Sequence, residues 1–158
     1  MINPFSPFPK RKDGIHVSLG APERSILTDL LQQLITLIQG GDTSDAAMTR
    51  LFPAAYADDE EASAEFRRLT GDDLAQGKVE NAKAVLRTLG KDRKVPLDTS
   101  EEQAWLRTLT DLRLTLASRL GVTPDGTIPA KDAATRVSEN VYDWLGFLQE
   151  SLVRTLVR

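Results

Sequence analysis

The chain has 158 residues, of which 41% are hydrophobic and 27% charged, as in an ordinary soluble globular protein. Its net charge of -3 excludes binding to nucleic acid by bulk attraction to phosphates, although it leaves room for local basic patches. The absence of cysteine excludes disulfides, thiol nucleophiles and thiolate metal sites. We expect a single domain over residues 1–158, in which an arm, 1–21, packs on a helical bundle, 22–158.

Residues 1–21 are predicted to form a β-hairpin. Three prolines before residue 10 favour an extended path, and residues 12–14 carry a turn signal between residues 5–11 and 15–19. Apolar and polar residues alternate in the second segment, as in a half-buried strand. The only histidine, His16, falls on the outer side of that strand without an evident carboxylate to orient it, so we expect a surface residue rather than a general base.

The central part of the chain is predicted to be helical. A helix starts near Pro22 and ends at residues 40–41, both glycine, and a short helix over residues 44–51 stops before Pro53. Four consecutive acidic residues at 58–61 suit a helix start better than a calcium loop, whose ligands are spread around a turning glycine. The next helix covers residues 74–89.

The last third of the chain carries two long helical patterns. Thr99 and Glu102 have capping-box spacing, and the helix that they start ends at Leu120 before a glycine. The final helix, from Val137 onwards, is apolar beyond one stripe, because Tyr142 and Phe147 widen it. Either this helix is central, or part of it contacts another protein. The predicted fold is mainly α: a bundle of four to five helices with a short N-terminal β-hairpin.

Polar residues beside the apolar stripes are the candidate site. At 100° per residue, Arg113 and Arg119 lie beside the stripe of their helix, and Gln149 lies next to that of the final helix. Asp111 and Asp143 fall on outer faces. Arg113, Arg119 and Gln149 either tie helices together in a polar network or line a ligand pocket.

A basic cluster covers the end of the helix over residues 74–89 and the loop after it. These residues either complement the negative end of the helix dipole or form a patch for nucleic acid or an acidic protein. The cluster consists of Arg87, Lys91, Arg93 and Lys94.

No recognised device for nucleotide binding, metal binding or hydrolysis occurs in the chain. The phosphate-loop pattern and the Gly-x-Ser-x-Gly elbow are both missing, so we expect no cofactor and no metal. The first residues lack a basic segment followed by an apolar run, and polar residues interrupt the longest apolar stretch, 30–38. We therefore expect a cytoplasmic protein with no signal peptide and no membrane span.

Several strings, in their order and spacing, resemble the actinobacterial family of unknown function DUF2017. They are RLFPAAY at 50–56, AEFRRLT at 64–70, DDL at 72–74, WL at 105–106, DLRL at 111–114, RLG at 119–121 and YDWLGFLQESL at 142–152. The resemblance implies a cytoplasmic, mainly helical protein. Some relatives are described as oxidative-stress regulators that act through contacts with sigma factor and RNA polymerase, with a cysteine pair as the sensor. This chain has no cysteine, so a regulatory role can carry over but a thiol switch cannot.

Two function classes follow from these observations. The first is a non-enzymatic regulatory or adaptor protein that contacts a protein partner, with sigma factor or RNA polymerase as the candidates that the resemblance implies. The second is a small-molecule (anion) binding or enzymatic domain with an arginine-lined pocket. Direct contact with nucleic acid is not expected, and a homodimer is compatible with either class. The candidate contact residues are Arg67, Arg68, Arg113, Arg119 and Gln149.

Overall fold

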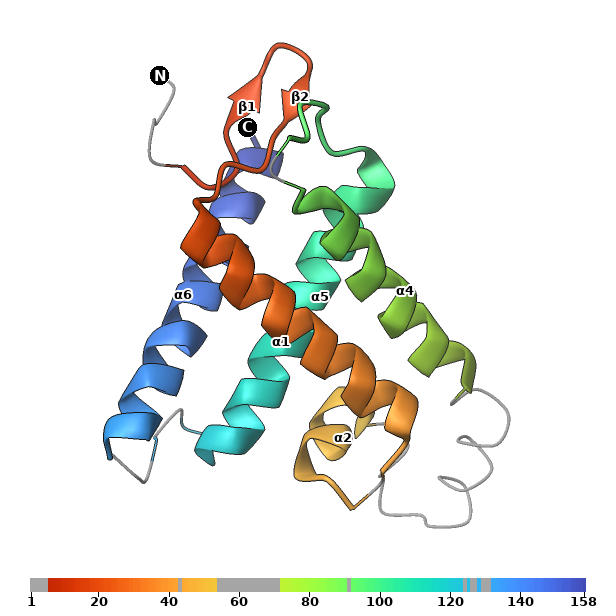
Figure 1. Ribbon diagram of the computed structural model, residues 1–158, viewed down its shortest axis with the longest axis vertical. Coiled ribbons are helices and arrows are strands. Elements are labelled where there is room, and N and C mark those ends of the chain that lie inside the picture. Colours follow the sequence, from red (N-terminus) through yellow and green to blue (C-terminus); the bar gives the residue numbers. More distant parts are fainter. Residues whose placement is uncertain are drawn as a thin grey trace.

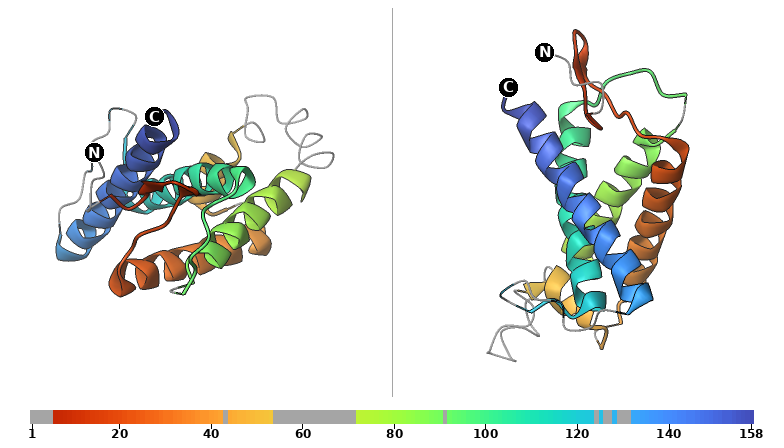
Figure 2. Two further views of the ribbon diagram at one scale, coloured as in Figure 1. Left: turned by 90° about the horizontal axis from the view of Figure 1, so that it is seen from above. Right: turned by 90° about the vertical axis from the view of Figure 1, so that its left-hand side faces the viewer.

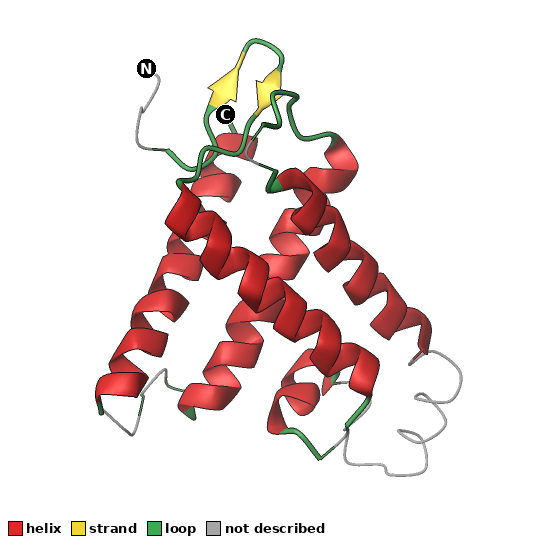
Figure 3. Ribbon diagram, in the orientation of Figure 1, coloured by secondary structure: helices red, strands yellow, loops and turns green. Residues whose placement is uncertain are grey.

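The computed structural model describes residues 6–42, 44–53, 72–90, 92–123, 125, 128 and 132–158 (Figure 1). These residues form five helices and one two-stranded antiparallel hairpin, which confirms the mainly α fold (Figure 3). The acidic run at 58–61 and the candidate residues Arg67 and Arg68 lie outside the described residues. Among the described helices, none combines the length and apolarity that crossing a membrane requires.

The N-terminal hairpin is shorter than predicted. Strand β1, Lys10–Arg11, pairs with β2, Gly14–Ile15. Two further backbone bonds continue the pairing, since the N–H groups of His16 and Ser18 donate to the carbonyls of Pro9 (3.0 Å) and Pro7 (2.8 Å). Proline has no N–H to donate in return, so the regular ladder ends where the prolines begin.

Helices α1, Ala21–Gly40, and α2, Ala46–Leu51, follow the hairpin. Helix α1 ends as predicted, because Gly41 adopts the left-handed conformation (φ 63°) that closes a helix. Asp45 caps the start of α2, because its carboxylate accepts a hydrogen bond from the N–H of Ala47.

Helix α5, Thr99–Leu120, is the central element. It contacts α1, α2, α4 (Asp72–Thr88) and α6 (Ala133–Leu156), and the views in Figures 1 and 2 show it between the other helices. Its capping box is formed by Asp98 and Glu101, one residue before the predicted pair. Asp98 supplies a carboxylate, which accepts a stronger hydrogen bond from the helix N–H groups than a hydroxyl does.

The core joins the arm to the helices at Trp105. Its indole is fully buried and packs edge-to-face against Phe8, with ring centroids 5.1 Å apart. The indole N–H donates to the hydroxyl of Thr88 on α4 (2.9 Å). Helix α6 adds its fully buried side chains from Leu145 onwards, whereas Val137, predicted to belong to the apolar stripe, is 65% exposed.

Candidate functional site

Arg113 lies between α5 and α6 and is half-buried. Its guanidinium stacks over the ring of Tyr142, 4.6 Å from the centroid, and lies directly against the backbone of Gly146. A β-carbon at position 146 would come within 3.3 Å of the guanidinium, so the glycine leaves the space that the arginine fills. Stacking on an aromatic face fixes the plane of the guanidinium without neutralising its charge.

Gln149 connects the two helices through hydrogen bonds of its neutral amide. Its amide nitrogen donates to the hydroxyl of Thr110 on α5 (2.6 Å), and its amide oxygen accepts a long bond from Nη1 of Arg113 (3.4 Å). The Nε of Arg113 is buried without a hydrogen-bond partner. In the described part of the chain no carboxylate forms a salt bridge with Arg113, and its contacts on α6 are an amide and a ring, although Asp143 and Glu150 line the same groove.

A shallow, open groove of about 680 Å³ runs along α6 beside these residues. Arg113, Gly146 and Gln149 line it together with two apolar side chains that solvent reaches, Phe147 (51% exposed) and Val153 (44% exposed). The structure thus brings together two of the candidate residues from the sequence, Arg113 and Gln149. It combines them with exposed apolar surface on the final helix.

Arg119, the third candidate on α5 and α6, lies elsewhere and has a carboxylate partner. Its guanidinium donates two hydrogen bonds to Asp45 (2.7 and 3.0 Å), which ties the end of α5 to the start of α2. These bonds, followed by the bond from the Ala47 N–H, lower the pKa of Asp45 from 3.8 to about 2. The geometry gives Arg119 a structural role.

Asp111 does not lie on an outer face, so that prediction was wrong. The side chain is buried and pairs with Lys78 of α4 across 2.8 Å. Burial raises the pKa of Asp111, and the ammonium of Lys78 opposes that shift. The prediction assumed that α5 is covered only along its one apolar stripe. In the structure α4 covers a second side of α5, and Asp111 lies on that side.

His16 is also not the surface residue that the sequence predicted. It is 6% exposed, and its Nε2 lies 2.7 Å from Oδ1 of Asp13, a bond that lowers the pKa of Asp13. Its neighbour Ile15 is buried too. Adjacent residues of a strand point to opposite faces, so the hairpin is covered on both faces rather than one.

The basic cluster after α4 is partly engaged in ion pairs. Arg93 lies 2.7 Å from the carboxylate of Glu101 near the start of α5, and Arg87 occupies the last turn of α4, where a cation suits the dipole. Lys91 lies outside the described residues.

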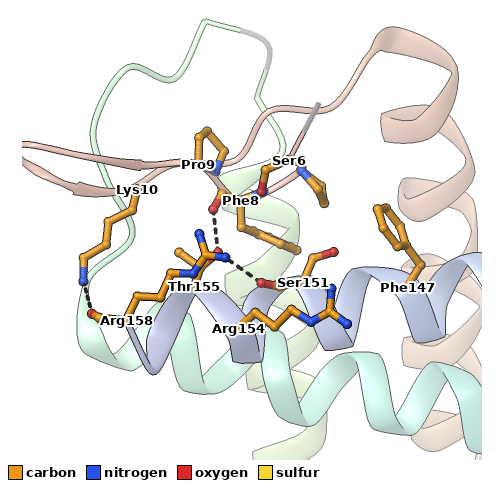
Figure 4. Close-up of a pocket in the computed structure, with 10 residues that line it drawn as sticks. Ser6, Phe8, Pro9, Lys10, Phe147, Ser151, Arg154, Thr155 and Arg158 are labelled. Atoms are coloured by element: carbon orange, nitrogen blue, oxygen red, sulfur yellow. Dashed lines mark hydrogen bonds between the residues drawn. The ribbon is translucent and has the colours of Figure 1, made fainter. Parts of the chain in front are cut away.

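A second, smaller recess lies between the N-terminal arm and the end of α6 and has a volume of about 170 Å³ (Figure 4). Three cations and three hydroxyls line it, and none of these residues was a candidate site residue from the sequence. They are Lys10, Arg154, Arg158, Ser6, Ser151 and Thr155. The basic run at 10–12 is a sequence signal, but only the fold brings it to residues more than a hundred positions away.

A family model described as a domain of unknown function, DUF2017, matches residues 4–156. The chain belongs to the DUF2017 family. It matches no curated protein and no solved structure.

The described residues of this DUF2017 chain show no metal-binding cluster. They contain no group of three or more His, Cys, Asp or Glu side chains that could hold a metal. The single histidine is buried beside the hairpin turn and lines neither the groove nor the recess. The groove presents the carboxylates of Asp143 and Glu150 beside its arginines, its amide and its apolar side chains, whereas the recess presents cations, hydroxyls and apolar surface. Mixed polar and apolar surface of this kind occurs at protein interfaces.

Proposed function

We propose that the chain is a non-enzymatic regulatory or adaptor protein that binds a protein partner through the outer face of α6. The observation that carries this proposal is the exposure of Phe147 and Val153 beside Arg113, with which no described carboxylate forms a salt bridge. Aromatic and arginine side chains dominate the energetics of protein interfaces. Because Arg113 is already stacked and packed, it loses little conformational entropy when a partner covers it.

The choice of partner is supported by the family. The chain is a DUF2017 member, and the resemblance described above includes relatives that act on sigma factor and RNA polymerase. We therefore propose a cytoplasmic partner from the transcription machinery of an actinobacterium. Regulation of this chain would operate without a thiol switch, because the sequence has no cysteine.

The test is direct binding of the purified chain to the sigma factors and the core RNA polymerase of its native host, measured by surface plasmon resonance. We expect saturable binding to one of them, weakened at least about tenfold by Phe147→Ala or Arg113→Gln. Ile26→Ala is the matched control, since Ile26 is an apolar side chain of α1 that is 40% exposed and lies outside the groove. Absence of binding, or equal effects of Phe147→Ala and Ile26→Ala, would contradict the proposal.

The alternative function is binding of a small-molecule anion. The absence of a salt bridge between Arg113 and a described carboxylate favours this alternative. Sites for small ligands are concave and bury most of the ligand surface, however, and the groove at Arg113 is open and shallow. A thermal-shift screen of phosphorylated and carboxylated metabolites separates the two functions. Stabilisation by such a compound that Arg113→Gln abolishes would establish the small-molecule function instead.

A further inference from the structure

We propose that the recess between the N-terminal arm and the end of α6 is a subsite for carboxylate side chains, so that the partner binds with an acidic segment. This inference rests on the proposed function and names the chemistry of the partner. The recess adjoins the groove, because Phe147 and Arg154 line both. A single bound segment can therefore occupy the two together.

The charge distribution favours an anionic ligand at this end of the molecule. Residues 6–18 and 150–158 contain five lysines and arginines but only two acidic residues, whereas the whole chain has a net charge of -3. Figure 1 shows the hairpin and the end of α6 at the same end of the fold. Lys10, Arg11 and Lys12 are all exposed on the hairpin. Local positive charge of this kind attracts and orients an acidic partner.

The walls of the recess are fixed by hydrogen bonds between the arm and α6. The hydroxyl of Thr155 donates to the carbonyl of Phe8 (3.0 Å), with the carbonyl of Ser151 as a second acceptor at the same distance. Nζ of Lys10 donates to the backbone oxygen of Arg158 (2.7 Å). Figure 4 shows the bonds from Thr155 to Phe8 and from Lys10 to Arg158, which link the two walls. A site whose walls are fixed before binding loses little entropy on binding.

Two arginines remain able to bind a carboxylate in this recess. Among the described residues Arg154 forms a salt bridge with Glu150 alone, one turn earlier. Both side chains are more than 60% exposed, so the pair is weak and easily exchanged. Arg158 forms no salt bridge within the described residues. A guanidinium binds a carboxylate through two parallel hydrogen bonds, and the hydroxyls of Ser6 and Ser151 supply further donors at the wall.

The size and lining of the recess favour a protein side chain. A volume of about 170 Å³ corresponds to roughly five or six waters, which is room for one side chain. Phe147 provides an apolar wall between this recess and the groove that contains Val153. The fitting segment therefore places an acidic residue in the recess and an apolar residue on Phe147. A nucleic acid backbone would instead carry its next phosphates past Glu150 and Asp143, both exposed beside the groove.

The test uses two pools of short synthetic peptides that combine leucines with glutamates at varied spacing. In the second pool, glutamine replaces every glutamate. Nuclear magnetic resonance of the labelled full chain is expected to show saturable shifts with the glutamate pool, confined to residues 6–12 and 147–158. Arg154→Gln combined with Arg158→Gln is expected to weaken this binding at least about tenfold. Arg136→Gln, a change at an exposed arginine near the start of the same helix, is expected to have no effect.

Several results would overturn the subsite. The subsite is contradicted if the glutamate pool causes no shifts or if the two pools bind equally well. It is also contradicted if the double variant binds as well as Arg136→Gln, or if a single-stranded oligonucleotide binds more tightly at the same residues. Failure of the subsite is distinguishable from failure of the proposed function. If a transcription protein binds through Phe147 and the double variant binds it unchanged, only the subsite fails. If the glutamate pool binds in the recess but no transcription protein binds, only the proposed function fails.

Discussion

The carboxylate of Asp45 has two functions in the fold. It caps α2 through the N–H of Ala47, and it accepts both bonds from Arg119 at the end of α5. Both interactions favour the ionised form, so the pKa falls to about 2 from the value of 3.8 expected in the unfolded chain. A lowered pKa means that Asp45 stabilises the fold above pH 3.8 and that this contribution is lost as the pH falls through about 2.

We expect a carboxyl titration by nuclear magnetic resonance to give Asp45 a pKa of about 2. Arg119→Gln should raise this pKa and move the loss of stability on acidification to higher pH, because the larger of the two stabilising interactions is removed. The pKa should stay below 3.8 in the variant, since the bond from Ala47 remains. A wild-type Asp45 that titrates at its unfolded value would contradict the geometry.

The pair formed by Lys78 and Asp111 is mostly buried and gives a different prediction. Lys78→Met leaves a buried carboxylate without its cation, so we expect the free energy of unfolding at neutral pH to fall by about 3 kcal/mol. The pKa of Asp111, already raised by burial, rises further in the variant. The contribution of Asp111 to stability is therefore most favourable at low pH and is lost as the pH rises through that pKa.

Urea unfolding measures this effect, with Lys83→Met as the control. Lys83 is an exposed lysine of the same helix, and its removal should change the free energy of unfolding by no more than about 0.5 kcal/mol. Adding Asp111→Leu to Lys78→Met should restore most of the lost stability, because the unpaired charge is removed. Equal effects of the two lysine variants would show that the buried pair does not stabilise the fold.

At the scale of elements, the packing of α5 against α6 depends on a glycine. Alanine in a helix interior is about 0.5–1 kcal/mol more favourable than glycine, and at Gly77 of α4 a β-carbon would meet nothing within 4 Å. We expect Gly77→Ala to stabilise the fold by that amount. Gly146→Ala should stabilise less, because its β-carbon lies 3.3 Å from the guanidinium of Arg113.

The difference between the two alanine variants measures how firmly Arg113 is held. Repeating Gly146→Ala in a chain that carries Arg113→Gln should recover most of the missing stabilisation, as measured by thermal unfolding. Full stabilisation by Gly146→Ala in the wild-type background would mean that the guanidinium moves freely, and Arg113 would then not be preorganised for a partner.

Helix ends and helix faces were accessible from the sequence to different degrees. Glycines 41 and 121 close α1 and α5 as predicted, because only a residue that tolerates a left-handed conformation suits those positions. The angular position of Arg113 beside the apolar stripe was also derivable from helix geometry. Asp111 was misplaced because a single helix does not reveal that neighbours cover it on two sides. The burial of His16 could not be predicted for the same reason, because the pattern of one strand does not reveal which elements pack on its second face.

At the scale of the whole molecule, the arm holds the bundle together through Phe8. The ring is fully buried against Trp105, and the backbone carbonyl accepts the hydroxyl of Thr155. We expect Phe8→Ala to reduce the free energy of unfolding by about 4 kcal/mol, as for other buried aromatic residues. Hydrogen exchange should show the loss of protection reaching the end of α6 as well as the arm.

Phe147→Ala is the control for this prediction. Phe147 is half exposed, so its removal should cost much less stability, and the comparison also validates its use as a binding variant. If Phe8→Ala is no more destabilising than Phe147→Ala in urea unfolding, the arm contributes little to the fold. The basic recess could not be predicted from sequence spacing. Its two walls, the arm and α6, lie at opposite ends of the sequence and meet only in the folded chain.

The central position of α5 has a consequence for the newborn chain. Synthesis on the ribosome releases α1, α2 and α4 before the helix that each of them contacts. Until Trp105 has left the exit tunnel, Phe8 has no indole to pack on, and until the rest of α5 has followed, the leucine-rich face of α1 lacks part of its cover. We therefore expect folding to be delayed until late in translation and the nascent chain to depend on chaperones that shield apolar segments during this interval.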